Sequence, residues 1–197
     1  MRIKYHGNSC FLLKSKKSKL ITNPKSKGVK VNLKKVAPDV IVLSHKADVS
    51  ENGYYLISTS GEYEVKEIFV YGFISDPDRV GSEYADIYMF NLEGVHLGMI
   101  DRSVKSISGD ILDEMGIVNV LFVSLASDSS MKLTKLTDLV NKIEPQIVIP
   151  MDYEKENLVN FTKALGVKEP EKVPNLDVKR TDFIEEDMPL RVVVLEK

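Results

Sequence analysis

The residues best suited to chemistry follow a short apolar run, Val40–Leu43, which leads directly into Ser44-His45 and a polar loop. Three of the four apolar residues are β-branched, so the run predicts a buried strand. A loop that leaves a buried strand is held rigidly, and such loops carry much of the chemistry of α/β proteins. A lone histidine is a poor zinc site, so we interpret His45 as a residue that forms a hydrogen bond within its loop, in preference to a metal ligand.

Few other residues have the chemistry of a nucleophile, a base or a ligand. The chain contains three histidines and one cysteine, namely His6, His45, His96 and Cys10. Cys10 has no evident base beside it in the sequence, and its setting is typical of a small buried hydrophobe. Asp48 lies in a turn sequence and is interpreted as a loop cap, whereas Asp152 has the stronger functional claim. We therefore expect no catalytic residues.

Many short strands are predicted to position these loops. They are Met1–Tyr5, Cys10–Lys14, Lys19–Thr22, Val40–Leu43, Tyr54–Ser58, Ile68–Ile74, Asp86–Leu92, Val95–Ile100, Val118–Ser124, Gln146–Ile149, Leu176–Arg180 and Leu190–Leu195. Polar turns separate the first three, which predicts an antiparallel meander. Ser60-Gly61-Glu62 is interpreted as a turn, and Glu93-Gly94 predicts a hairpin.

Three helices are predicted in the second half of the chain. The first runs from a Ser108 cap to Met115, and the second begins at a cap on Ser129 or Ser130. A third follows the next strand. Many strands with a late strand–helix–strand–helix segment predict an α/β fold with a mixed sheet. The length of 197 residues predicts a single domain, residues 1–197.

The composition is that of a globular protein, with 43% hydrophobic and 28% charged residues. Apolar runs are far shorter than the roughly 20 residues of a membrane span, and one cysteine with no signal-like N-terminus predicts the cytoplasm. Residues 1–46 carry twelve Lys or Arg and one acid, a balance of +11, so the net charge of −2 leaves −13 for the rest. This lysine-rich N-terminal face is interpreted as a solvated surface, and the alternative is a docking surface for an acidic partner or for weak, nonspecific nucleic-acid binding.

Five short segments carry a family resemblance by their order and spacing. They are Gly7-Asn8-Ser9-Cys10-Phe11, Asn23-Pro24, Leu43-Ser44-His45, Ser60-Gly61-Glu62-Tyr63-Glu64-Val65 and Pro150-Met151-Asp152-Tyr153. Together they resemble the metallo-β-lactamase superfamily, and within it the branch of small zinc-dependent hydrolases. The resemblance covers nearly the whole chain. It implies an αββα sandwich of two mixed β-sheets flanked by helices.

The resemblance also implies a metal site, in which five or six His and Asp side chains hold one or two zinc ions. Most of those positions hold other residues in this chain. The positions of the former pocket are Asn8, His45, Ala47, Asp48, Val49, Ser50, Ser75, Asp101, Arg102 and Asp152. Of these, Asn8, Ala47, Ser50, Ser75 and Asp152 stand where the family has histidine, and Val49 and Arg102 stand where it has aspartate. We therefore expect neither zinc nor another cofactor.

These departures predict a protein that has lost its metal ligands and serves as a binding or assembly module. Its partner would be another protein or a second copy of itself. A hydrolase with an altered site is the alternative, in which Asn8, His45, Asp48, Asp101 and Asp152 surround magnesium or manganese. A third hypothesis is a nucleic-acid-associated protein that uses the lysine-rich N-terminal face.

Arg102 carries a more specific prediction. Clustered carboxylates repel one another when no cation lies between them, and a guanidinium can hold a carboxylate through two hydrogen bonds. We predict that Arg102 occupies part of the former metal site and pairs with Asp152. Because strand side chains alternate, a shift of one residue would turn Asp101 inward and Arg102 to solvent instead.

Overall fold

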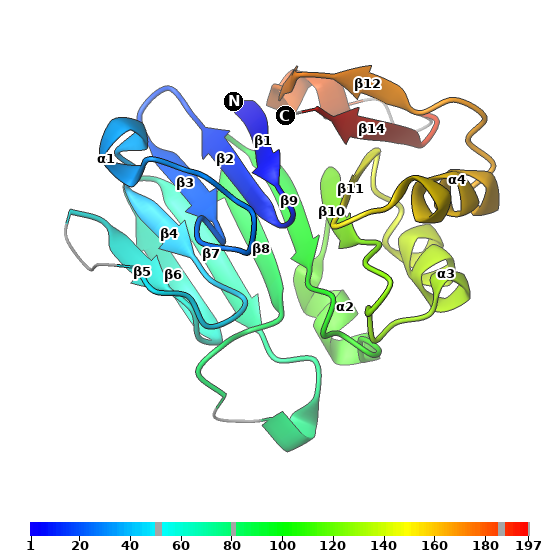
Figure 1. Cartoon of the computed structure of the whole chain (residues 1–197), viewed down its shortest axis with the longest axis horizontal. Coiled ribbons are helices and arrows are strands. Elements are labelled where there is room, and N and C mark those ends of the chain that lie inside the picture. The colour runs from blue at the N-terminus through cyan, green and yellow to red at the C-terminus, as the bar shows by residue number, and fades with distance from the viewer. Residues whose placement is uncertain (50–52, 80–81, 185–187, 197) are drawn as a thin grey trace.

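The computed structural model describes residues 1–49, 53–79, 82–184 and 188–196, and their strands pair into two sheets (Figure 1). The six-stranded sheet contains, in spatial order, β13 (Asn175–Asp177), β1 (Arg2–Gly7), β2 (Cys10–Lys14), β3 (Lys19–Thr22), β4 (Val40–Val42) and β5 (Tyr55–Ile57). The eight-stranded sheet contains β12 (Glu171–Val173), β14 (Arg191–Leu195), β11 (Ile147–Met151), β10 (Val120–Ser124), β9 (Val95–Ile100), β8 (Ile87–Leu92), β7 (Ile68–Phe73) and β6 (Gly61–Val65).

Both sheets are mixed, which confirms the predicted fold class. Strands β1, β2 and β3 pair antiparallel, as the meander prediction requires, and β3, β4 and β5 pair parallel. In the larger sheet, β9, β10, β11, β14 and β12 are parallel, whereas β6 to β9 are antiparallel. The carboxyl ends of parallel strands lie at one edge of a sheet, so the residues that follow β9, β10 and β11 are brought together there.

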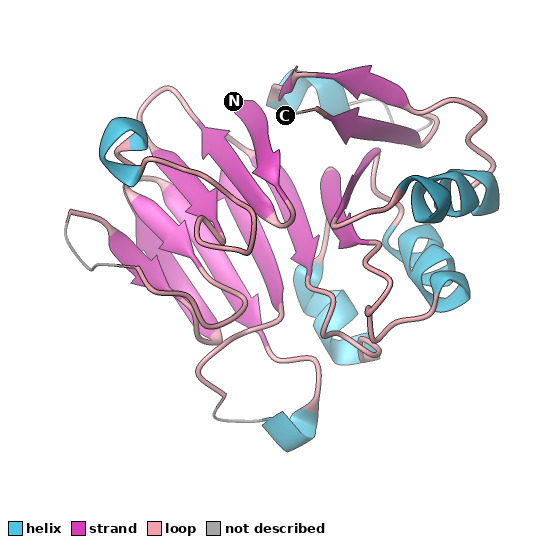
Figure 2. Cartoon of the chain, viewed as in Figure 1, coloured by secondary structure: helices cyan, strands magenta, loops and turns pink. Residues whose placement is uncertain are grey.

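Helices lie mainly on the outer side of the larger sheet (Figure 2). They are α1 (Leu33–Val36), α2 (Gly109–Met115), α3 (Leu133–Ile143) and α4 (Lys155–Ala164), with short 3₁₀ helices at Pro77–Arg79 and Arg180–Phe183. Apolar faces of α2, α3 and α4 pack against that sheet, and α1 with its neighbouring loops covers the outer side of the smaller sheet. No helix in the described part of the chain has the length and apolar character to cross a membrane.

The two sheets meet through a buried aromatic and aliphatic core. The rings of Tyr5 and Phe11 lie 5.0 Å apart, and Phe11 reaches across to Phe122 of β10 at 4.5 Å. Tyr88 is fully buried, and its hydroxyl oxygen lies 2.8 and 2.7 Å from the carbonyl oxygens of Leu43 and Ser58, which share its one proton as acceptors. These contacts fix the start of the His45 loop, because Leu43 is the last apolar residue before it.

Two predictions about local structure were wrong. Gly61, predicted as part of a turn, begins β6, which pairs along its whole length with β7. Helix α3 has Lys132 at its N-cap rather than a serine. The Ser129 hydroxyl and the Ser130 N–H donate instead to the carbonyl of Arg102, at 3.4 and 2.8 Å. The serines therefore hold the loop after β9 instead of capping the helix.

Candidate functional site

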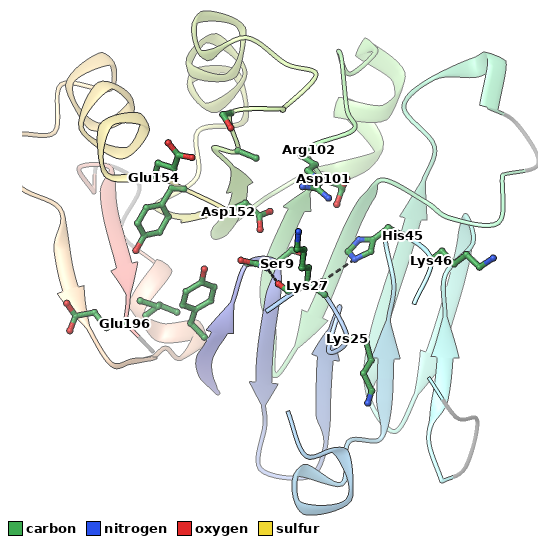
Figure 3. Close-up of a pocket in the computed structure, with 17 residues that line it drawn as sticks. Ser9, Lys25, Lys27, His45, Lys46, Asp101, Arg102, Asp152, Glu154 and Glu196 are labelled. Atoms are coloured by element: carbon green, nitrogen blue, oxygen red, sulfur yellow. Dashed lines mark hydrogen bonds between the residues drawn. The ribbon is translucent and has the colours of Figure 1, made fainter. Parts of the chain in front are cut away.

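The loops after β1, β4, β9 and β11 surround a pocket of about 970 Å³ (Figure 3). Five predicted site residues line it, namely Asn8, His45, Asp101, Arg102 and Asp152. Further lining comes from residues that the prediction did not include, among them Tyr5, Ser9, Ser26, Lys27 and Tyr153. The resemblance thus pointed to the edge of the sheets where this pocket lies, but it named only some of the side chains that line the pocket.

Asn23 joins the loop after β3 to the loops after β1 and β4. It is fully buried and follows β3 with a positive φ of 42°, a conformation that asparagine tolerates better than most residues. Its Oδ1 accepts from the backbone N–H of Ser44 at 3.0 Å. Its Nδ2 lies 3.1 Å from the hydroxyl oxygens of both Ser9 and Ser44. The amide therefore positions the segment that carries His45.

Both ring nitrogens of His45 face serine hydroxyls. Nε2 lies 3.1 Å from Ser26 Oγ, and Nδ1 lies 3.3 Å from Ser44 Oγ. Burial lowers the pKa of His45, the charge of Asp101 partly opposes that effect, and the charge of Arg102 lowers the pKa further. A neutral imidazole has one donor and one acceptor nitrogen, so the two serines can satisfy it without a metal ion when Ser26 donates to Nε2 in place of the Asn23 carbonyl, which lies 3.1 Å from the same hydroxyl.

Asp101 points into the protein and is 7% exposed. Its Oδ2 accepts from Ser44 Oγ at 2.7 Å, and its Oδ1 accepts from the N–H and hydroxyl of Ser103 at 3.0 and 2.9 Å. A carboxylate only accepts, so the one hydroxyl proton of Ser44 is committed to Asp101. The Ser44 oxygen then accepts from His45 Nδ1 and from Asn23. Asn23, Ser44, His45, Ser26, Ser9 and Asp101 form one closed hydrogen-bond network.

Asp152 lies outside this network and has little compensation for its charge. It follows β11 with a φ of 55°, and among the described residues its side chain accepts one hydrogen bond, from Ser124 Oγ at 3.2 Å. Burial raises the pKa of Asp152 to about 6, although the Ser124 hydrogen bond and the charge of Arg102 act in the opposite direction. A half-buried carboxylate with a shifted pKa in an unusual backbone conformation is typical of functional sites.

The predicted pair between Arg102 and Asp152 was wrong. The guanidinium of Arg102 pairs with Asp128 at 3.4 Å, and both side chains are more than half exposed. The register explains the error. The N–H of Asp101 continues the sheet by donating to the carbonyl of Asp86 at 2.9 Å, so Asp101 turns inward and Arg102 turns to the rim of the pocket.

Four other predicted residues do not line the pocket, and one lies outside the described residues. Ala47 and Val49 pack against an apolar cluster, and Asp48 is exposed and does not line the pocket. The N–H and hydroxyl of Ser75 donate at 2.8 Å to the fully buried Asp86, which Arg79 also binds at 2.9 Å. Ser50 is the residue that the structure does not describe.

The donor set does not fit zinc. Within the described ranges 1–49, 53–79, 82–184 and 188–196, no group of three His, Cys, Asp or Glu side chains could hold a metal ion. The nitrogens of His45 and the oxygens of Asp101 already have protein partners. A zinc site needs three or four such ligands converging on one point.

The residues that the sequence interpretation missed are mostly serines. Ser26, Ser44 and Ser124 are common residue types whose hydrogen-bonding role depends on neighbours far away in the sequence. One signal was present, since Asn23-Pro24 occupies the position of an Asp-Pro pair in the resemblance. That position marks a side chain at the end of a strand beside the pocket.

Comparisons with known proteins agree with this geometry. The family profile described as the beta-lactamase superfamily domain matches residues 2–152. Among solved structures, one classified as a zinc-dependent hydrolase of the metallo-β-lactamase superfamily from Thermotoga maritima is similar, with a TM-score of 0.77 and 20% identity over 98% of this chain and 97% of that one.

Two further solved structures share the fold at lower identity. One is classified as a metal-dependent hydrolase from Parabacteroides distasonis, with a TM-score of 0.65, 12% identity, and coverage of 98% of this chain and 93% of that one. The other is an isothiocyanate hydrolase from Delia radicum gut bacteria, with a TM-score of 0.64, 9% identity, and coverage of 91% and 100%. No curated protein sequence matches the chain significantly.

Proposed function

Since the chain belongs to the β-lactamase superfamily, we propose that it is a member whose metal site has become a non-catalytic binding pocket. A fold can outlast its original chemistry, because function depends on a few side chains placed on the fold. We also propose a cytoplasmic setting, since the lone cysteine gives no internal disulfide and suits a reducing compartment.

The closed hydrogen-bond network is the observation that carries this proposal. In a metal site of this fold, histidine and aspartate side chains would direct their free nitrogens and oxygens at the ion. Here Ser26 and Ser44 occupy both nitrogens of His45, and Ser44 and Ser103 occupy the oxygens of Asp101. Binding a metal would require several of these hydrogen bonds to break.

The pocket also has no activated nucleophile in the part of the chain that the structure describes. Burial raises the pKa of the Cys10 thiol to about 12, so the thiol is protonated at neutral pH and unreactive. The hydroxyl of Ser44 donates its proton to Asp101 at 2.7 Å, a carboxylate whose other oxygen is held by Ser103. Ser44 is itself buried and does not line the pocket, so its hydroxyl is not placed to attack a molecule bound there.

A hydrolase with an altered site is the second candidate function, because His45, Asp101 and Asp152 line the same pocket. In this hypothesis, magnesium or manganese would bind mainly through carboxylate oxygens. Asp48 would take no part, since it is exposed outside the pocket.

Hydrolase assays separate the two candidates. We expect a phosphodiester, a lactone and a β-lactam to be hydrolysed only at the rate of the protein-free blank, with zinc, magnesium or manganese added or omitted. A metal-dependent rate that is abolished by Asp152→Ala and retained by Asp48→Ala would contradict the proposal. Asp48→Ala is the matched control, because it removes a carboxylate from the same set of predicted ligands outside the pocket.

A further inference from the structure

Charges of both signs line the pocket. Figure 3 shows Asp152 and Glu154 in one part of it, here called the acidic side, and Lys27 and Arg102 next to Asp152 from opposite edges of the pocket, here called the basic side, with Lys25 and Lys46 beyond them. Lys27 extends from its loop toward the space between Asp152 and His45 (Figure 3). The Asn8 amide donates to the backbone carbonyl of Lys27 and so holds that loop at the pocket.

The two sides do not neutralise each other. Among the described residues, no ion pair joins Asp152 or Glu154 to Lys27 or Arg102, and the partner of Arg102 is Asp128 at the exposed rim. Asp101 is not a free charge of the pocket, since three hydrogen bonds hold its carboxylate. Among the described residues, Lys27 and Asp152 therefore face the open space without an ion-pair partner, and Arg102 shares its charge with Asp128 at the rim.

Two tyrosines add to the acidic side. Tyr5 and Tyr153 line the pocket, and burial raises the pKa of both. The charge of Asp152 raises the pKa of Tyr5 further, and both side chains line the same pocket. A pocket lined by aromatic rings and a carboxylate is a favourable setting for an ammonium group, which can gain from a ring face as well as from the charge.

We propose that the pocket binds a zwitterionic small molecule, with its ammonium against Asp152 and the tyrosines and its acidic group between Lys27 and Arg102. This inference rests on the proposed function, because it takes the pocket to be a binding site without catalysis. A ligand of this kind supplies a partner for both sides at once. A simple anion would leave the negative charge of Asp152 without a partner, and a simple cation would be repelled by the positive charges of Lys27 and Arg102.

Isothermal titration calorimetry at neutral pH with ω-amino acids of increasing length tests the inference. The probes are γ-aminobutyrate, δ-aminovalerate and ε-aminocaproate, and the half-molecules hexylamine and hexanoate are the references. At least one ω-amino acid should bind about tenfold or more tightly than either reference, since each charge-assisted hydrogen bond is worth that much or more. No binding by the series, or binding no tighter than the references, would overturn the inference.

Variants of each side should weaken that binding in the same way. Asp152→Asn, Lys27→Gln and Arg102→Gln should each reduce the affinity of the best probe by about tenfold. Lys30→Gln is the matched control, because Lys30 is exposed in the same segment as Lys27 but does not line the pocket. An equal loss with Lys30→Gln would show general charge attraction and overturn the inference.

The same experiment separates this inference from the proposed function. If the protein is inactive and metal-free and also binds none of the probes, the inference of a zwitterionic ligand is overturned, but the proposal of a non-catalytic pocket still holds. Metal-dependent hydrolysis of any substrate in the hydrolase assays would contradict the proposed function itself.

Discussion

Replacing Asn23 with alanine should lower the free energy of unfolding by about 3–5 kcal/mol, because buried polar groups would lose their partners. The side chain makes three hydrogen bonds, to the Ser44 N–H and to the hydroxyls of Ser9 and Ser44, in a fully buried position. Alanine would also have to adopt a φ of 42°, a left-handed conformation that is less favourable for alanine than for asparagine. Urea unfolding followed by circular dichroism measures the change.

Asn8→Ala is the matched control for this substitution. Asn8 also has a positive φ, 51°, but it lies at the pocket and its side chain donates one hydrogen bond, to the carbonyl of Lys27. The control should lose about 1–2 kcal/mol, so the difference between the two variants isolates the buried network. Equal losses for Asn8→Ala and Asn23→Ala would contradict the role of Asn23 as the residue that joins the loops.

Replacing Asp152 with asparagine should have the opposite effect and stabilise the protein by about 2 kcal/mol above pH 6. The pKa of Asp152 is raised to about 6 by burial, so the ionised carboxylate is disfavoured in the folded state. Asparagine can still accept from Ser124 and tolerates the φ of 55°. A stabilising substitution at a pocket residue would indicate a group kept for binding at the expense of stability.

The gain should depend on pH. Between about pH 4 and 6, the folded protein binds a proton at Asp152 that the unfolded chain does not, so the wild-type protein loses stability as the pH rises through this range. The advantage of Asp152→Asn should therefore be absent near pH 4 and complete above pH 6. Asp48→Asn, an exposed control, should change stability by less than about 0.5 kcal/mol. Destabilisation by Asp152→Asn at neutral pH would show that the carboxylate is well compensated.

Most strands could be predicted because their apolar residues alternate or run continuously between polar turns. Lys19–Thr22 and Val95–Ile100 have the predicted bounds, and Ser108 caps α2 as expected. Strand β6 was missed, since a glycine at its start and exposed glutamates within it are typical of a turn. Its strand conformation depends on pairing with β7, which no local pattern reveals.

Site residues could be predicted from the sequence only where they follow directly after the end of a predicted strand. His45 and Asp152 follow buried strands, and both line the pocket. The choice between Asp101 and Arg102 depended on a register of one residue, which the backbone hydrogen bond from Asp101 to Asp86 decides. The serine partners come from separate loops, so their roles depend on the three-dimensional arrangement of the sheets.

Metal content tests the central claim most directly. The purified full-length protein, dialysed against excess zinc and then against metal-free buffer, is analysed by inductively coupled plasma mass spectrometry. A protein zinc site contributes roughly 10–16 kcal/mol of binding free energy and would retain its ion through this procedure. The closed network around His45 and Asp101 predicts far less than one metal ion per chain. A ratio near one zinc, manganese or iron per chain, with anomalous density beside His45 in crystals, would contradict it.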